Sequence, residues 1–460
     1  MTGLNNTKNS WSAVFFCILF SLYIFPVAAE PAEIHEEYPS EKNYPFAVGN
    51  AMLSNIFLFS LNRFIGHADF SMISRQSIYD NLTGPWQWDS STFLVNQFGH
   101  PYQGYAYYAA GRANNLNPAE SLFVTALGSY TWEVFAERVP PAINDFVSTT
   151  IGGVSLGEMI HRIYLDIYTR NRLLATIISP MDAFNDFVTG SSQRPTNSKI
   201  QYTNLSFSTS YLALENRQNG EIYSKDTYNS AAVGLGLQMR YGDPFVSGIS
   251  SVFDYFDLDL GLEGGYDWYD SFIVSDGSLL SITPHSGEPS WTSYGLHLHF
   301  DYYSGSLIDF SANSLSFGLR RERESEQRLS YYFKADAGLL MFGSGSFAQN
   351  ELDSENKTNI SRDYGYGGMV KLGLTMKYPA GFSISMKNAH YYRSIFPGSI
   401  PNSEGSVLYN TSNIDIKHQV NDRTSVGARN SFSWEKTNRE YVPDHNKIVF
   451  KVSTFMEYQL

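Results

Sequence analysis

The chain is nearly without cysteine: Cys17 is the only one among 460 residues. It lies within an apolar run, residues 13–27, so the chain after this run carries no thiol. That excludes a disulfide framework, a thiolate metal site and a cysteine nucleophile from the remainder. Cys17 also lies too deep in the run, and too far from the small residues that follow it, to be a lipoprotein cysteine. We therefore expect no acyl anchor.

Positive charge is also scarce, since the formal net charge is −13. Nucleic acid is not an expected partner, because phosphate binding requires a basic face. Long apolar runs are missing beyond residue 30. Residues 52–65 come nearest, but Asn55, Asn62 and Arg63 interrupt them, so we expect no spanning helix there.

The N-terminal residues 1–29 have the pattern of a secretory signal peptide. Polar residues with one cation, Lys8, precede the apolar run, and Val27, Ala28 and Ala29 supply the small-residue cleavage pattern. The alternative is a membrane anchor, but the run is shorter than the roughly 20 residues needed to cross a bilayer. The acidic, proline-bearing residues 30–44 are expected to be a linker.

Aromatic residues are abundant, at 15% of the chain with 32 Tyr and 32 Phe. From residue 199 onward, apolar and polar residues alternate with a period of two, which places them on opposite faces of a strand. Residues 233–241, 294–302 and 370–378 show the pattern most clearly. The expected outward face includes Leu235, Leu296, Leu372 and Met456.

About eleven such segments can be counted, and bacterial outer-membrane barrels have even strand numbers, so we expect about twelve. The last segment, residues 448–460, alternates through to Leu460, as in the terminal strand of such barrels, where an aromatic residue is more usual. A soluble sandwich with one wet face also alternates. It fits less well, because the segments are long and aromatic residues cluster at their ends. The predicted fold for residues 199–460 is a transmembrane antiparallel β-barrel.

Residues 45–175 have helical periodicity and predict a small α-helical domain, with residues 176–198 as a second linker. Asn117, Pro118 and Glu120 form a helix start signal. The helix that follows, to about Glu137, is apolar nearly all round, so we expect it to be buried. Its only polar row is Ser121, Thr125, Ser129 and Glu133.

The segment with Gly99, His100, Pro101 and Tyr102, followed by Trp132–Glu133 and by Gly152, Gly153 and Gly157, resembles an uncharacterised bacterial family, domain of unknown function 3943. The resemblance covers about residues 85–175. It implies an envelope protein of Gram-negative-type bacteria without an agreed activity. The family's polar positions fall here on His100, Glu120, Glu133, Glu137, Asp145 and Glu158. His161 is not among them.

Glu133 and Glu137 are one helical turn apart, with His100 before them and Asp145 after them. Carboxylates on an apolar helix are costly to bury unless they are paired or bound. One hypothesis is catalytic: His100 as base and a glutamate as acid or orienting group, acting on an envelope lipid or glycan. The other is a structural network, in which the glutamates pair with Arg112, Arg138 or Arg162 or bond backbone amides.

A metal hypothesis rests on Glu158 and His161, whose spacing occurs in carboxylate-bridged di-iron bundles. Glu120, Glu133 and Glu137 are the only further ligands that can be named, fewer than such a site requires. A polar cluster is also expected in the barrel lumen, as a cation or solute passage, a metal site, or the ordinary polar interior of a barrel. Its members are Asp257, Asp259 and Glu263 on one strand and His297, His299 and Asp301 on the next.

These patterns predict an outer-membrane protein that serves solute passage or envelope organisation, with the helical domain packed in or under the barrel as a plug. An envelope enzyme and a periplasmic binding protein are the alternatives. The expected partners are outer-membrane lipid and the barrel assembly machinery. No cofactor and no nucleic acid are expected, and the sequence does not identify the solute.

Overall fold

The computed structural model describes residues 41–460 except 90, 190–197, 219–220, 225–226, 247, 250–251, 267, 285–289, 307, 326–327, 349–359, 400–403 and 441. The predicted signal peptide and residues 30–40 of the predicted linker lie outside the described residues. The chain divides into two compact units, residues 1–198 and residues 199–460.

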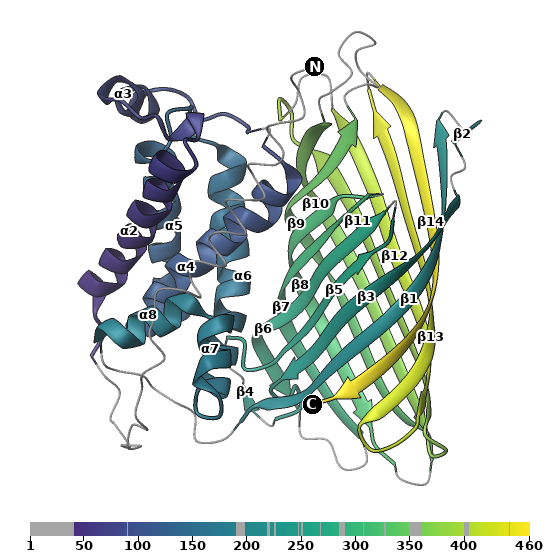
Figure 1. Cartoon of the computed structure of the whole chain (residues 1–460). Coiled ribbons are helices and arrows are strands. Elements are labelled where there is room, and N and C mark those ends of the chain that lie inside the picture. The colour runs from purple at the N-terminus through teal and green to yellow at the C-terminus, as the bar shows by residue number, and fades with distance from the viewer. Residues whose placement is uncertain are drawn as a thin grey trace. The chain divides into compact units, whose positions relative to one another are not determined.

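The first unit is helical (Figure 1). Residues 176–198, expected to be a linker, contain the end of one further helix and the whole of another. The elements are α2 (Tyr44–Ser60), η1 (Leu61–Ile65), η2 (Asp69–Ser71), α3 (Arg75–Thr83), η3 (Val95–Gly99), α4 (His100–Ala113), α5 (Pro118–Phe135), α6 (Ile143–Tyr168), α7 (Arg172–Ile178) and α8 (Pro180–Thr189).

Helix α5 begins where the sequence predicts. The Asn117 side chain accepts a hydrogen bond from the Glu120 backbone amide at 2.9 Å, and the Glu120 carboxylate accepts one from the Asn117 amide at 2.9 Å. Pro118 occupies the first turn, where its missing N–H costs nothing. These contacts fix the start of α5 next to the end of α4.

Helices α4 and α6 are in backbone contact. A Cβ on Gly104 would lie 1.9 Å from the Thr149 carbonyl oxygen, and one on Gly153 would lie 2.6 Å from the Gly104 Cα. Only glycine fits at these two positions, because any side chain would push the helices apart. Small residues thus set the spacing at the centre of the helical unit.

The second unit is a barrel (Figure 1). Its strands are β1 (Ile200–Gln218), β2 (Glu221–Ser224), β3 (Thr227–Tyr241), β4 (Gly248–Ile249), β5 (Phe256–Gly264), β6 (Tyr269–Thr283), β7 (Ser290–Gly305), β8 (Phe310–Arg323), β9 (Ser330–Ala348), β10 (Ile360–Tyr378), β11 (Phe382–Ile395), β12 (Gly405–Gln419), β13 (Thr424–Arg439) and β14 (Val442–Gln459).

Neighbouring strands pair antiparallel, and β14 pairs with β1 from Asn204↔Gln459 to Gln218↔His445, which closes the ring. Within the described residues the ring contains twelve long strands, while β2 and β4 are short additions at its rims. The predicted strand number and the predicted closing strand are confirmed. Closure leaves no unpaired edge along the wall.

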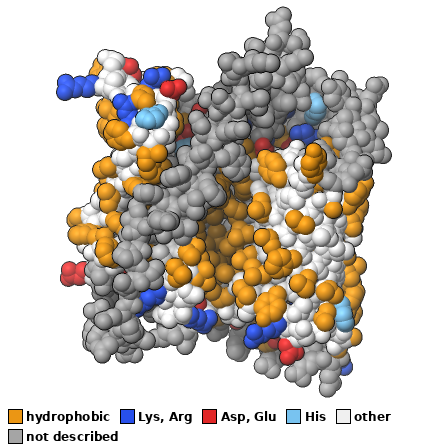
Figure 2. All heavy atoms as spheres, viewed as in Figure 1, with side chains coloured by type: hydrophobic (Ala, Val, Ile, Leu, Met, Phe, Trp, Pro, Cys, Tyr) orange, Lys and Arg blue, Asp and Glu red, His pale blue; other side chains and the backbone are white. Residues whose placement is uncertain are grey.

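The two faces of the barrel wall differ as the alternation predicts. Leu235, Leu296, Leu372 and Met456 point outward, with 57%, 42%, 46% and 47% of their surface exposed. His297, His299 and Asp301 are buried in the lumen. Apolar side chains accordingly cover the outer wall (Figure 2). An apolar outer wall around a charged interior is the organisation of transmembrane barrels of bacterial outer membranes.

One helix beyond residue 30 has the length and composition of a membrane span, which the interrupted apolar stretch in the sequence did not lead us to expect. Helix α2 begins at Tyr44, earlier than the apolar stretch read from the sequence, and continues through η1. The combined helix Tyr44–Ile65 has 22 residues and is long and apolar enough to cross a bilayer, and only 22% of its most apolar window is buried. Asn50 and Asn55 do not weaken this, because both side chains face the interior of the helical unit.

Candidate functional site

The two polar sets predicted for the lumen lie on β5 and β7, with β6 between them. β6 pairs Asp276 with Asp257 on one side and with His299 on the other. The expectation that the sets occupy neighbouring strands is therefore wrong. Strands two apart are separated by roughly 10 Å, which is too far for direct hydrogen bonds. The sets are Asp257, Asp259 and Glu263, and His297, His299 and Asp301.

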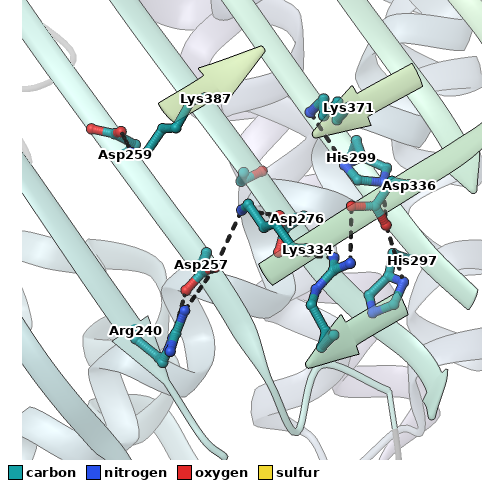
Figure 3. Close-up of polar contacts among 12 residues, drawn as sticks. Arg240, Asp257, Asp259, Asp276, His297, His299, Lys334, Asp336, Lys371 and Lys387 are labelled. Carbon is teal, nitrogen blue, oxygen red and sulfur yellow. Dashed lines mark hydrogen bonds and ion pairs between the residues drawn. The ribbon is translucent and has the colours of Figure 1, made fainter. Parts of the chain in front are cut away.

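Residues that the sequence analysis did not single out connect them (Figure 3). Arg240 Nε lies 2.9 Å from Asp257 Oδ1. Lys334 Nζ lies 3.3 Å from Asp257 Oδ2 and 2.7 Å from Asp276 Oδ2. Lys334, on β9, thus joins the acidic residues of β5 and β6 across the lumen.

Arg320 continues this network toward β7. Its guanidinium lies 2.9 Å from Asp336 and 3.7 Å from Asp276. His297 Nδ1 lies 3.5 Å from the Asp336 carboxylate on the other side. Arg320 is almost completely buried, so each of these charges depends on its partner and not on water.

His299 has a defined tautomer, because Lys371 is a pure donor. Lys371 Nζ lies 3.2 Å from His299 Nδ1, so that nitrogen accepts, and the neutral ring then donates from Nε2 to Ser316 Oγ at 2.7 Å. Lys371 also donates to Asp301 at 2.6 Å, and Tyr391 donates to the other Asp301 oxygen at 2.9 Å. These hydrogen bonds connect side chains of β7, β8, β10 and β11 to one another.

The buried network is balanced in charge. Four cations meet four carboxylates, and the two histidines add no formal charge when neutral. Such a balance is what allows charges to remain inside a barrel, since an unpaired buried charge costs several kcal/mol. The cations are Arg240, Arg320, Lys334 and Lys371, and the carboxylates are Asp257, Asp276, Asp301 and Asp336.

A cavity of about 870 Å³ lies beside this network. It extends from the strand ends that carry Gln201 and Gln459 to Tyr303, Tyr391 and Tyr409 inside the lumen. Carboxylates on its wall concentrate on β5 and β6, whereas β9 to β11 contribute only lysines among their charged lining residues. These strand groups lie on roughly opposite sides of the ring. Lys387 on β11 reaches Asp259 on β5 at 2.7 Å, so one ion pair crosses between them.

The inner end of the cavity is closed by an aromatic group, which we call the aromatic layer: Tyr303, Phe310, Tyr391 and Tyr409. Phe310 stacks on Tyr409 with ring centroids 4.3 Å apart and lies 4.8 Å from Tyr391. Tyr303 lies 5.7 Å from Tyr409. The layer belongs to an apolar cluster inside the barrel that also contains Trp268 and Ile308. The described side chains therefore close the lumen at this level.

His100 and Asp145 meet in the helical unit, as the sequence suggested. His100 Nε2 lies 3.5 Å from Asp145 Oδ1, and His100 Nδ1 lies 3.2 Å from Thr149 Oγ1. Burial lowers the pKa of His100 to about 4. Burial, and then the neighbouring Glu133, raise the pKa of Asp145 well above its usual range. Both environments disfavour charge.

Glu133 bonds a backbone amide, which the structural hypothesis named as an alternative to the arginines, and Glu137 bonds an indole N–H. The Ala142 amide donates to Glu133 Oε2 at 2.8 Å, and Trp132 Nε1 donates to Glu137 Oε1 at 2.8 Å. Glu133 Oε1 has no hydrogen-bond partner among the described residues. Burial raises the pKa of Glu137 to about 7. The catalytic hypothesis for these residues stays a prediction.

Glu158 and His161 do not act as a pair. Arg112 Nε and Arg162 Nε each lie 2.8 Å from the Glu158 carboxylate, which neutralises it, while His161 Nδ1 bonds Asp182 at 2.6 Å. Asp182 lies on α8, in the stretch expected to be a linker. No group of three or more metal-ligating side chains is arranged to hold an ion in the part of the chain that the structure describes.

A serine-nucleophile spacing, Gly153, Ser155 and Gly157, lies within α6. The nucleophile turn that uses this spacing requires a sharp connection between a strand and a helix. Here Ser155 Oγ donates to the Ile151 carbonyl at 3.2 Å inside a continuous helix. The motif is a packing feature of α6.

The sequence reasoning missed Arg320, Lys334, Asp336 and Asp276 as members of the lumen network. Alternation from Phe333 onward places Lys334 and Asp336 on the polar face of β9, so their direction could have been predicted. Their partners could not, because contacts across a closed ring depend on its diameter and shear.

No curated protein matches this sequence. Solved structures similar to the chain include an outer membrane channel from Pseudomonas putida F1, at 10% identity over 58% of this chain and 100% of that chain, with a TM-score of 0.29. Others are the outer membrane channel DcaP of Acinetobacter baumannii (10% identity, 59% and 99% covered, TM-score 0.26) and the KdgM porin (11% identity, 54% and 98% covered, TM-score 0.23). Residues 85–184 match the family described as Domain of unknown function (DUF3943), which confirms over that segment the resemblance predicted from the sequence.

Proposed function

We propose that the barrel passes small polar solutes across the outer membrane and that the described arrangement is its closed form. The observation that carries this is the cavity of about 870 Å³ within the lumen, walled by charged side chains and stopped by the aromatic layer. A barrel built only as a scaffold would not need such a cavity. A soluble periplasmic binding protein would not need an apolar outer wall.

The cavity's volume supports a small-molecule solute. Sites for ligands of that kind have volumes of roughly 300–1,000 Å³. The same volume is far below that of a folded helical domain. We assign closure to the aromatic layer, and the packing of the helical domain in or under the barrel stays a prediction.

The open end of the cavity is proposed to face the periplasm. An even number of strands brings both ends of the barrel to the same rim, the rim where Gln201 and Gln459 line the opening. The unit of residues 1–198 precedes β1, and the proposal takes the rim that carries both ends of the barrel sequence as the periplasmic one. The aromatic layer, which lies near the ends of β7, β8, β11 and β12 at the other rim, is then on the outer side of the cavity.

Conductance across a planar bilayer tests the proposal. The variant Phe310→Ala/Tyr409→Ala removes the stacked pair of the aromatic layer and is expected to raise single-channel conductance at least several-fold. Phe317→Ala is the matched control, because Phe317 lies on the same strand as Phe310 but faces outward, with 61% of its surface exposed.

Wild-type protein and the control should conduct alike. Heat-modifiable migration on gels establishes that all three barrels are folded. Equal conductance in a folded double variant would refute a lumen closed by these side chains.

A further inference from the structure

On α2 the usual distribution of side chains in a water-soluble protein is reversed, because small and polar side chains face the interior and large apolar side chains face outward. The residues that α2 buries are small or polar: Ala47, Asn50, Ala51 and Asn55. Its large apolar side chains are exposed instead, Ile56 with 61% of its surface. The exposed set on α2 and η1 is Tyr44, Phe46, Leu53, Ile56, Phe57, Phe64 and Ile65.

Helix α5 repeats the inversion. The sequence predicts a buried helix, and its polar row is buried, since Ser121, Thr125, Ser129 and Glu133 face the interior with 0–1% of their surface exposed. Val124, Trp132 and Val134 are buried beside this row. Phe123, by contrast, is 74% exposed. The exposed apolar set on α5 is Leu122, Phe123, Leu127, Tyr130 and Phe135. In water, a helix with one polar row would turn that row outward.

The two helices lie side by side and point in the same direction. At their N-terminal ends, Lys42 and Tyr44 bond Glu120 at 2.9 and 2.7 Å. Further along, Asn55 Nδ2 donates to the Gly128 carbonyl and to Thr131 Oγ1, both at 3.0 Å. Their exposed residues therefore belong to one region of the surface, which we call the apolar face. Figure 2 shows apolar side chains along α2.

Charged residues border this face only at its two ends. No charged residue occurs between Lys42 and Arg63, and on α5 none occurs between Glu120 and the buried Glu133. The 22 residues of Tyr44–Ile65 span about 33 Å at 1.5 Å per residue, close to the roughly 30 Å thickness of a bilayer's hydrocarbon core. Tyr44 lies at one end of this length, where amphipathic aromatic side chains meet headgroups.

We propose that the apolar face, formed by α2, η1 and the outward side of α5, contacts the acyl chains of a bilayer, so that the helical unit is anchored in lipid independently of the barrel. Soluble monomers rarely expose contiguous apolar patches beyond a few hundred Å². The interior of the helical unit is packed as in membrane helix bundles, because glycines set the α4–α6 contact and buried amide and hydroxyl groups form hydrogen bonds between helices. A second copy of the chain would not require the spacing between the two charged ends to match hydrocarbon thickness.

Fluorescence quenching in vesicles tests the proposal, and the scarcity of cysteine makes site-specific labelling simple. The full chain carrying Cys17→Ser receives one cysteine, as Ile56→Cys or Phe123→Cys, for an environment-sensitive dye. Gln76→Cys on α3 is the control, because Gln76 is polar and exposed on the same unit. The vesicles contain phosphatidylethanolamine and phosphatidylglycerol, with a nitroxide on the acyl chains or with iodide in the buffer.

Labels at positions 56 and 123 should lose most of their emission to the nitroxide and little to iodide, with the reverse at position 76. Strong iodide quenching at 56 and 123 in the folded protein would place the face in water and overturn the proposal. Protection from both quenchers, with cross-linking between chains through the same cysteines, would also overturn it and make the face an interface between copies. Heat-modifiable migration again verifies that each variant has a folded barrel.

Discussion

The substitution Arg320→Met is expected to destabilise the barrel by about 3–5 kcal/mol. Arg320 lies 2.9 Å from Asp336, where Coulomb's law with an effective dielectric constant of about 20 gives an attraction of roughly 6 kcal/mol. Desolvation of the guanidinium offsets part of this. Asp276 retains Lys334 at 2.7 Å, so the loss falls mainly on Asp336, whose remaining described neighbours, His297, His299 and the Ser316 hydroxyl, carry no formal charge when the histidines are neutral.

The double variant Arg320→Met/Asp336→Asn removes the stranded charge and should recover most of the lost stability. Urea unfolding of the barrel in lipid, followed by tryptophan fluorescence and by heat-modifiable migration, measures each variant. Lys387→Met is the control, because the Lys387–Asp259 pair is partly exposed and its loss should cost less than about 1 kcal/mol. A cost below about 1 kcal/mol for Arg320→Met, or a double variant less stable than the single one, would refute this reasoning.

Two further predictions concern the helical unit. Because burial raises the pKa of Glu137 to about 7, its contribution to stability is complete below its ordinary value of 4.5 and is lost as the pH rises through 7. Glu137→Gln should therefore reduce the loss of thermal stability between about pH 5 and pH 8, by at most roughly 3 kcal/mol, and an unchanged pH dependence in helical circular dichroism melts would contradict this. Gly153→Val should separate α4 from α6 and lower the melting temperature by an amount equivalent to about 3 kcal/mol or more. Gly49→Ala is the control: nothing lies within 4 Å of a Cβ at Gly49, so this variant should be neutral or slightly stabilising. Similar melting temperatures for the two variants would argue against close contact between α4 and α6.

The barrel could be predicted from the sequence because a period of two is a local property. Leu235 and Met456 are assigned to the outer face by their immediate neighbours, whatever the rest of the chain does. The contacts within the lumen could not be predicted. Lys371 and Asp301 are 70 positions apart in the sequence, and predicting their contact requires knowledge of the pairing register of every strand from β7 to β10.

The helical unit shows a second limit. The sequence identified the polar row of Ser121, Thr125, Ser129 and Glu133 correctly, but periodicity only separates two faces of a helix and does not say which one is inside. Which face is inside depends on whether water or lipid surrounds the helix. The start of α5 was predictable, because Asn117 and Glu120 act through local hydrogen bonds that no distant packing can override.

The opposed charges of the cavity have a consequence for any molecule inside it. Lysines on β9 and β11 pair with carboxylates on β5 and β6: Lys334 with Asp257 and Asp276, and Lys387 with Asp259. Lys387 and Asp259 already neutralise each other across this space, so a solute that moves along the lumen meets a crossing ion pair, which it has to open or pass around.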